Sequence, residues 1–171
     1  MKLNIGSGNK IKKSYINLDI VKLKNVDVVW DLNKYPWPFK NDTFKEVFAD
    51  NVLEHLDSIV KPLEEIYRIS KKKAKIKIIV PFSPSVWSFA DPTHKQFYTY
   101  FTFNYFRTND ALNYYSPARF VILKRKIIFN KYFKLFELFI NSISLFKKIY
   151  VIFLYFLIPA NFLEVELEVI K

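Results

Sequence analysis

The stretch Lys2-Leu3-Asn4-Ile5-Gly6-Ser7-Gly8 gives the clearest indication of how this 171-residue chain folds. Residues 2–5 read as a short buried strand, and the tripeptide after them contains the only two glycines of the sequence. Glycine has no Cβ, so it reaches positive φ and lets another molecule approach the main chain closely. A glycine turn after a first strand is where nucleotide-like ligands commonly dock in open α/β sheets. The stretch therefore predicts a ligand site at one edge of such a sheet.

The composition is that of one domain with a sizeable core. Hydrophobic residues make up 51% of the chain and aromatic residues 19%, which argues against disorder. The lack of cysteine excludes disulfides, thiolate metal sites and a cysteine nucleophile. His55 and His94 are the only histidines, so we expect no metal site. The chain opens on a strand-like run without the layout of a signal peptide, so we expect a cytoplasmic protein.

The net charge of +11 fits either an anionic partner, such as nucleic acid or a membrane surface, or a lysine-rich composition. The lysines are scattered, apart from Lys71-Lys72-Lys73 with Lys75 and Lys77. We expect this cluster in a solvated loop between a helix and a strand. We therefore favour the compositional interpretation over a nucleic-acid partner.

Short apolar runs alternate with connecting segments, which is typical of an α/β sheet with parallel neighbours. The predicted strands cover residues 2–5, 15–20, 26–30, 44–49 and 75–80, and a helix capped by Asp57 or Ser58 runs to about residue 69. Asp19, Asp31 and Asn51 each follow one of these strands. The carboxyl ends of parallel strands share one edge, so these side chains should gather there with the glycine turn.

The second half is predicted to complete the same domain. It contains a short helical turn over 85–90, an aromatic segment over 98–108, a strand over 118–129, a long helical stretch over 132–157 and a last strand over 162–170. Period-two alternation in the last strand places Glu164, Glu166 and Glu168 on one face. The sequence shows no repeat or linker, so we treat residues 1–171 as a single domain.

A series of short motifs follows one another in a distinctive order. They are Leu3-Asn4-Ile5-Gly6-Ser7-Gly8, Tyr15-Ile16-Asn17-Leu18-Asp19-Ile20, Trp30-Asp31-Leu32, Tyr35-Pro36-Trp37-Pro38-Phe39, Asp42-Thr43-Phe44, Val52-Leu53-Glu54-His55-Leu56 and Asp91-Pro92-Thr93-His94-Lys95. In this order the chain resembles the class I S-adenosylmethionine-dependent methyltransferases, specifically the small type-11-like group. The resemblance covers most of the chain and is clearest from Leu3 to Pro81.

The resemblance implies an α/β fold with a Rossmann-like, mostly parallel sheet of about seven strands and an antiparallel last strand. It also implies methyl transfer from S-adenosyl-L-methionine to an unidentified acceptor. Residues 1–81 would bind the cofactor, and residues 82–171 would form the acceptor half, with an apolar helical insertion over 132–158. The implied cofactor-binding residues are Gly6, Ser7, Gly8, Asp19, Asp31, Leu32 and Asn51. Among them Asp19 would accept hydrogen bonds from the ribose hydroxyls, and Asp31 with Leu32 would contact the adenine.

The acceptor side is implied by the loop after the fifth strand. His55, Asp91 and Tyr98 would line the substrate pocket, and His94 would be a general base, since an unperturbed histidine titrates near neutral pH. Each has a structural alternative. His94 could hold Asp91 or a backbone carbonyl, Tyr98 could be a core residue, and Glu54 with His55 could support the site without transferring protons.

The chain departs from the family pattern in ways that keep other functions open. Residues 9–14 leave almost no room for a first helix, and Lys71-Lys72-Lys73-Ala74 replaces the usual glycine turn before the fifth strand. The main alternative is a non-catalytic methyltransferase-like scaffold that associates with a membrane surface or a protein partner. A third hypothesis, from charge alone, is an RNA-binding or RNA-modifying protein.

The apolar segment over 132–158 is too short for a membrane span, which takes about 20 residues. One interpretation is an interfacial helix with peripheral membrane contact through Lys131, Lys134, Lys147 and Lys148. The other, which we favour, is a core-packing insertion or the seam of a homodimer. A membrane surface would suit a lipid-linked or glycan acceptor, whereas a small-molecule acceptor requires none.

Overall fold

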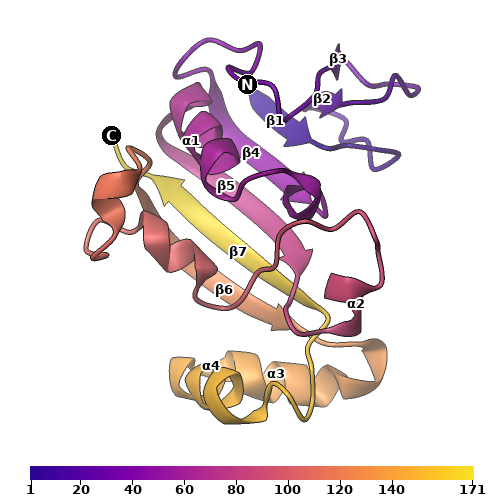
Figure 1. Ribbon diagram of the computed structural model, residues 1–171, viewed down its shortest axis with the longest axis vertical. Coiled ribbons are helices and arrows are strands. Elements are labelled where there is room, and N and C mark those ends of the chain that lie inside the picture. Colours follow the sequence, from indigo (N-terminus) through magenta and orange to yellow (C-terminus); the bar gives the residue numbers. More distant parts are fainter.

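The computed structural model describes residues 1–171 apart from the side chain of Asn113. Over this backbone the strands form one mixed sheet in the order β3-β2-β1-β4-β5-β7-β6 (Figure 1). Neighbours from β3 to β5 are parallel, whereas β7 runs antiparallel to both β5 and β6. The predicted Rossmann-like sheet of about seven strands with an antiparallel last strand is confirmed.

The strands are β1 (Lys2–Ile5), β2 (Ile16–Asp19), β3 (Val28–Val29), β4 (Phe44–Asp50), β5 (Ser70–Pro81), β6 (Phe120–Ile128) and β7 (Phe162–Val169). The helices are α1 (Val60–Ile69), α2 (Val86–Phe89), α3 (Lys134–Ser142) and α4 (Ser144–Ile149), with single helical turns at η1 (Leu53–His55), η2 (Thr102–Phe106), η4 (Lys131–Phe133) and η5 (Tyr150–Leu154). The third strand is shorter than predicted because it lies at the edge of the sheet, where short strands are common.

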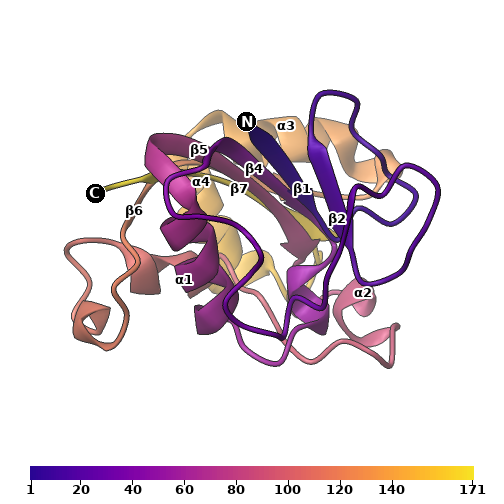
Figure 2. The same ribbon diagram turned by 90° about the horizontal axis from the view of Figure 1, so that it is seen from above.

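One part of the core lies between the sheet and α1, and another lies beneath the insertion, where Ile140 and Tyr150 are buried. Ile5 and Ile78 are fully buried and belong to the same apolar cluster as Leu63 and Ile66 of α1. The Ser58 hydroxyl accepts hydrogen bonds from the first two main-chain amides of α1, so the predicted cap at this residue is confirmed. Figure 2 shows α1 and α3 on opposite sides of the sheet.

The prediction of a loop over Lys71–Lys73 is wrong, because these residues belong to β5. Further along this strand, Lys75 pairs with Glu168 at 2.5 Å and Lys77 with Glu164 at 2.9 Å, both glutamates lying in β7. Every second side chain of a strand points to the same face, so lysines fit a strand whose one face is charged and half-exposed. The predicted alternation of glutamates in the last strand is confirmed by the same pairs.

The first helix is reduced, as predicted: the backbone of residues 9–15 forms turns. Two buried amide side chains hold these turns against the sheet. The side-chain amide of Asn4 donates to the side-chain oxygen Oδ1 of Asn17 at 2.9 Å and to the Lys10 main-chain carbonyl at 3.0 Å. The same Asn17 oxygen accepts from the Lys12 amide at 2.9 Å. Side-chain hydrogen bonds therefore replace the packing that a helix would provide.

The helical stretch predicted over 132–157 is present as a helical insertion before the last strand, but it is not one continuous helix. It divides at Ile143, whose extended backbone (φ −135°, ψ 155°) separates α3 from α4. Buried Glu137 of α3 accepts from the Phe129 amide at 3.0 Å and pairs with Lys134 and Lys126. Among the described residues, none of the helices combines the length and the apolar character needed to cross a bilayer.

The Glu137 carboxylate should stabilise the protein at neutral pH but not in acid. Burial disfavours its ionised form, but hydrogen bonds from Lys134, the Phe129 amide and Lys126 outweigh burial and lower the pKa below the ordinary 4.5. A lowered pKa stabilises the folded state above the ordinary value, and this contribution disappears as the pH falls through the folded-state pKa. Glu137→Gln should lower the free energy of unfolding by about 1–2 kcal/mol at pH 7.

Urea unfolding at pH 7 and pH 4 measures this difference. The gap between wild type and Glu137→Gln should narrow at the lower pH. An equal gap at both pH values would show that the carboxylate charge is not what anchors α3.

Candidate functional site

The carboxyl ends of β1, β2 and β4 border a cavity of about 430 Å³, here called the glycine-loop cavity. It is lined by Gly6, Gly8, Asp19, Ile20, Trp30, Asp31, Leu32, Asn33, Asn51, Val52, His55 and Leu56. All the predicted cofactor-binding residues except Ser7 are among them. Ser7 is 2% exposed, and its amide donates to the Leu18 carbonyl at 3.0 Å. The fold therefore gathers the predicted residues around one hollow.

The two glycines of the turn serve different purposes. Both have positive φ, +60° at Gly6 and +46° at Gly8. A Cβ on Gly6 would lie 2.2 Å from a methyl carbon of Val52, so Gly6 allows the turn to pack against the segment after β4. A Cβ on Gly8 would meet nothing within 4 Å. Gly8 therefore leaves open space on the cavity side of the turn.

Asp19 closes the turn from the end of β2. One carboxylate oxygen accepts from the Gly8 amide at 2.7 Å, and the other accepts from the Val21 amide at 3.0 Å. Each oxygen of an ionised carboxylate can accept more than one hydrogen bond. The main chain thus fixes the orientation of Asp19 and leaves acceptor capacity at the cavity.

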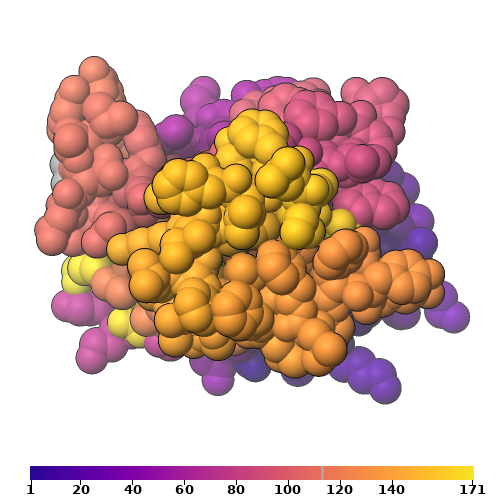
Figure 3. Space-filling view, turned by 90° about the horizontal axis from the view of Figure 1, so that it is seen from below, coloured from indigo at the N-terminus to yellow at the C-terminus, as the bar shows by residue number. Residues whose placement is uncertain are grey.

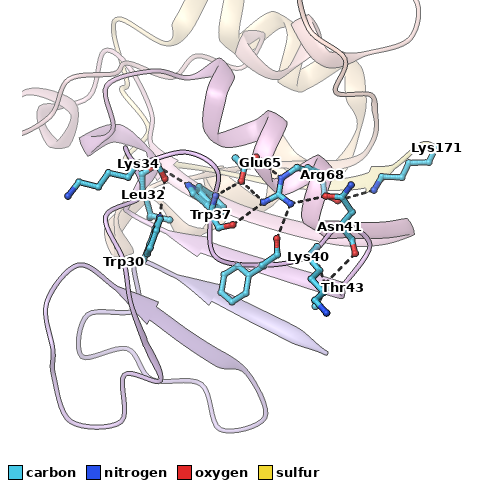
Figure 4. A network of polar contacts seen from close by, with 11 residues as sticks. Trp30, Leu32, Lys34, Trp37, Lys40, Asn41, Thr43, Glu65, Arg68 and Lys171 are labelled. Carbon is cyan, nitrogen blue, oxygen red and sulfur yellow. Dashed lines mark hydrogen bonds and ion pairs between the residues drawn. The ribbon is translucent and has the colours of Figure 1, made fainter.

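The wall formed by Asp31 and Leu32 is held from behind by a polar network (Figure 4). The Trp37 indole donates to the Leu32 carbonyl at 3.0 Å, and the Trp37 amide donates to Glu65 at 2.7 Å. Arg68 forms two hydrogen bonds of 2.7 Å with the same Glu65 carboxylate and a third of 3.1 Å with the Trp37 carbonyl. Bidentate pairs of this kind are among the stronger polar contacts in proteins. They connect the proline-rich loop to α1.

Asn51 stands where this cavity meets a second one. Its φ is +51°, a left-handed conformation that asparagine tolerates better than most residues. Its amide group donates to Asp50 at 2.8 Å, and Lys10 pairs with the other oxygen of Asp50 at 2.9 Å. The cationic side chain of Lys10, in the short segment between β1 and β2, is therefore linked through Asp50 to Asn51, which lines both cavities.

The second cavity, here called the histidine cavity, has a volume of about 550 Å³. It is lined by Asn51, Glu54, His55, Pro81, Trp87, Ala90, Asp91, Pro92, His94 and Phe162. Asn51 and His55 also line the glycine-loop cavity, so the two hollows are neighbours. Sequence reasoning placed His55, Asp91 and His94 on the acceptor side, and all three lie here.

Glu54 is the residue whose importance the sequence concealed. Its side chain is only 1% exposed, and among the described residues neither of its carboxylate oxygens has a hydrogen-bond partner. Burial raises the pKa of Glu54 to about 7, with a further contribution from the Asp50 and Asp91 carboxylates, against its own main-chain amide and Lys10. The Leu53-Glu54-His55 motif placed Glu54 near the predicted site. No pattern in the sequence, however, showed that its carboxyl is buried without a partner.

The two histidines are oriented by hydrogen bonds on their outer sides. His55 Nδ1 lies 2.9 Å from the Thr93 hydroxyl, which donates to Asp91 at 2.7 Å, so the imidazole is the donor to Thr93. His94 Nδ1 donates to the Ser88 carbonyl at 3.1 Å. His94 Nε2 lies 4.0 Å from a Glu54 oxygen and 4.0 Å from an Asp91 oxygen. Burial and the neighbouring His94 lower the pKa of His55.

Tyr98, which was predicted to line the acceptor pocket, lies in the hydrophobic core. It is 1% exposed, its ring stacks on Phe103 and its hydroxyl donates to the Leu53 carbonyl at 3.2 Å. The aromatic density around it reflects core packing, which was the stated alternative. Its contact with η1 makes it a support for the segment that carries Glu54.

Comparisons with known proteins place this architecture among the class I methyltransferase folds. No protein-family model matches the sequence, and no curated protein matches it. A SAM-dependent methyltransferase from Archaeoglobus fulgidus is 18% identical, with a TM-score of 0.64, 98% of this chain covered and 85% of that one. The methyltransferase from Haloferax volcanii solved with its activator Trm112 is 13% identical, with a TM-score of 0.62 and coverage of 99% and 82%.

A third similar structure holds the cofactor itself. It is Haemonchus contortus phosphoethanolamine N-methyltransferase 2 in complex with S-adenosyl-L-methionine, with 13% identity, a TM-score of 0.59 and coverage of 99% of this chain and 48% of that one. At these identities the comparisons establish the fold. This chain has the fold of class I S-adenosylmethionine-dependent methyltransferases.

The two glycines should differ sharply in their tolerance of a methyl group. Gly6→Ala should lower the free energy of unfolding by about 3 kcal/mol or more, because the new Cβ overlaps Val52 on a strained backbone. Gly8→Ala shares the positive φ but meets open space, so it should cost only about 1 kcal/mol. Urea unfolding of both variants measures the contrast, and equal losses would mean that the close approach to Val52 does not constrain the turn.

Proposed function

We propose that this protein binds S-adenosyl-L-methionine in the glycine-loop cavity and transfers its methyl group to an acceptor in the histidine cavity. The observation that carries the proposal is that the glycine-loop cavity and the histidine cavity, which have different linings, share Asn51 and His55. One is built by a glycine turn and a fixed carboxylate. The other holds a buried carboxyl and two imidazoles.

The residues of the glycine-loop cavity fit an adenosyl group. Asp19 keeps acceptor capacity for the two ribose hydroxyls, and hydrogen bonds to a charged acceptor are stronger than neutral ones. Asp31 can accept from the adenine amino group, while Leu32 and Leu56 supply apolar walls. Gly8 leaves room for close approach to the main chain. A protein of this fold solved in complex with S-adenosyl-L-methionine supports a cofactor of this kind.

Lys10 is the proposed substitute for the missing first helix. In this fold the amino end of that helix would face the carboxylate of the cofactor. Here the turn over residues 9–15 instead carries Lys10, held beside Asp50 next to the junction of the two cavities. A lysine ammonium supplies the positive charge that the helix terminus would have supplied.

The bound cofactor supplies an electrophilic methyl group on its sulfonium. The contribution of the protein is to align the acceptor for an in-line displacement, and such positioning alone accounts for much of the acceleration in reactions of this kind. A hydroxyl or amine acceptor must also lose a proton. His94 Nε2 is available to take it, because Nδ1 donates to the Ser88 carbonyl.

Titration calorimetry with S-adenosylhomocysteine tests the cofactor site. Asp19→Asn should weaken binding at least tenfold, about 1.4 kcal/mol, because an amide cannot accept from both ribose hydroxyls. The matched control is Asp57→Asn, which alters an exposed carboxylate outside the cavity and should leave affinity unchanged. No binding by the wild type, or equal affinity of wild type and Asp19→Asn, would contradict the proposal.

The same titration separates the two ends of the cofactor. Lys10→Ala should weaken S-adenosylhomocysteine but not methylthioadenosine, which lacks the amino-acid carboxylate. Equal losses for both ligands would show that Lys10 acts on the fold of the turn and not on the carboxylate.

The insertion suggests where the acceptor comes from. Figure 3 shows this segment, coloured orange to gold, covering much of one face of the molecule. Exposed large apolar side chains on this segment are Tyr132, Phe133, Leu135, Leu138, Phe139, Ile143, Leu145, Ile149, Ile152, Phe153, Phe156 and Leu157, here called the apolar face. Monomeric soluble proteins rarely leave so many together without a partner. Exposed Lys131 and Lys148 accompany them, so the segment combines apolar and cationic groups.

Trp87 connects the apolar face with the histidine cavity. It is 51% exposed and lines that cavity. It also lines a further hollow of about 420 Å³ together with Phe133 and Leu157 of the insertion. We therefore propose that the apolar face rests on an anionic bilayer and that the acceptor is a lipid-linked molecule. This also makes the protein peripheral at the membrane.

Co-sedimentation with vesicles tests the bilayer. Wild-type protein should bind vesicles containing phosphatidylglycerol more strongly than vesicles of phosphatidylcholine alone, and added salt should weaken the binding. The double variant Leu135→Ser/Phe153→Ser should lose binding at least tenfold, whereas Val29→Ser, at an exposed apolar site on β3, should retain it. Absence of vesicle binding, or a dimer abolished by the same double variant, would overturn the proposal in favour of a protein–protein contact.

A further inference from the structure

Glu54, His55 and His94 come together although 39 positions separate the last two in the sequence. Each offers one ligand atom, and these atoms all lie within 4.8 Å of one another. Glu54 and His55 belong to η1, and His94 belongs to the loop after α2. The three side chains face the histidine cavity.

The buried carboxyl lacks a counter-charge. The Glu54 side chain is 1% exposed, and neither oxygen has a hydrogen-bond partner among the described residues. A carboxyl buried in this way either takes up a proton, as its raised pKa of about 7 allows, or is ionised beside a cation. Lys10 lies in the vicinity but pairs with Asp50. The position of Glu54 is explained if a cation belongs beside it.

The histidines are held in the manner of metal ligands. A ligating imidazole usually donates its other ring N–H to a carbonyl or to a group connected with a carboxylate, which fixes its tautomer and its direction. His94 donates Nδ1–H to the Ser88 carbonyl, and His55 donates to Thr93, which is itself bonded to Asp91. Both rings therefore keep Nε2 as a free lone pair.

We propose that Glu54, His55 and His94 bind a divalent transition-metal ion such as Zn²⁺ or Mn²⁺ in the histidine cavity. Two imidazoles and one carboxylate are a common ligand set for such ions, and three protein ligands leave coordination positions open. Metal–ligand bonds of about 2.0–2.1 Å require ligand atoms about 3–3.5 Å apart, so small side-chain rotations close the site. This inference revises the sequence-based expectation of no metal.

The role of the ion rests on the proposed function, whereas its binding does not. An acceptor hydroxyl that enters an open position becomes more acidic, because a bound metal ion stabilises the deprotonated oxygen, and the released proton passes to solvent water. His94 would then hold the ion and would no longer be free to accept the proton. The junction at Asn51 and His55 places such an acceptor next to the cofactor cavity.

The experiment measures the ion directly. Chelator-stripped protein is titrated with Zn²⁺ against a chromophoric chelator, and with Co²⁺ to record the visible absorption of the bound ion. Wild type should bind one ion per chain. Glu54→Gln and His94→Gln should each weaken Zn²⁺ at least tenfold and remove the Co²⁺ spectrum. Circular dichroism and urea unfolding check that each variant folds, and Glu54→Gln should be no less stable than metal-free wild type.

Asp19→Asn is the matched control, because it should lose affinity for S-adenosylhomocysteine while binding Zn²⁺ normally. Metal binding without cofactor binding would support the site and refute the proposed function. Cofactor binding without stoichiometric Zn²⁺ binding would overturn the metal site and leave the function intact. Folded Glu54→Gln and His94→Gln variants that bind Zn²⁺ as wild type does would also overturn it.

Discussion

The Arg68–Glu65 pair is the interaction on which the candidate cofactor site depends. A proline-rich loop has few main-chain donors, so it cannot hold itself by regular hydrogen bonding. Instead, two side chains near the end of α1 bind the main chain of the loop. The Glu65 carboxylate accepts from the Trp37 amide, and the Arg68 guanidinium donates to the Trp37 carbonyl and to Glu65. The Trp37 indole in turn donates a hydrogen bond to the carbonyl of Leu32, which fixes the main chain next to Asp31. Breaking a partly buried pair costs on the order of 3 kcal/mol, and the cavity wall would be the first element to move.

The shortened first connection shows how the fold tolerates the loss of a helix. The amides of Asn4 and Asn17 satisfy the main chain of residues 9–15 from within the sheet, so the turn stays ordered without an apolar face to bury. The electrostatic role of the helix terminus is a separate matter, because it depends on charge and not on packing. In the proposed function a single ammonium at Lys10 supplies it, so that cofactor binding and loss of the helix are compatible.

Local chemistry made much of this structure predictable. Glycine is the residue type that most readily adopts positive φ, so the turn at Gly6 and Gly8 was predictable. The position of Asp19 was predictable because it ends a strand that pairs with strands close to it in the sequence. The pairing of Glu54 with His94 depends on how the loop after α2 folds back, which no periodicity records. Burial was equally hidden: an aromatic such as Tyr98 suits a pocket or a core, and only tertiary packing decides. The predicted helical stretch is interrupted at Ile143 for the same reason, because apolar character alone does not fix the backbone.

Specific hydrogen bonds hold the insertion in place, so loose packing does not explain why its apolar side chains are exposed. Tyr150 is fully buried, its hydroxyl donates to the Ile158 carbonyl at 2.8 Å and accepts from the Ala160 amide at 2.9 Å. The chain then enters β7 at Phe162, which lines the histidine cavity. A segment fixed at both the sheet and the cavity cannot turn its apolar face inward to escape water. In the proposed membrane contact the bilayer buries that face from outside the chain, and a surface that covers it also approaches Trp87 and the mouth of the cavity.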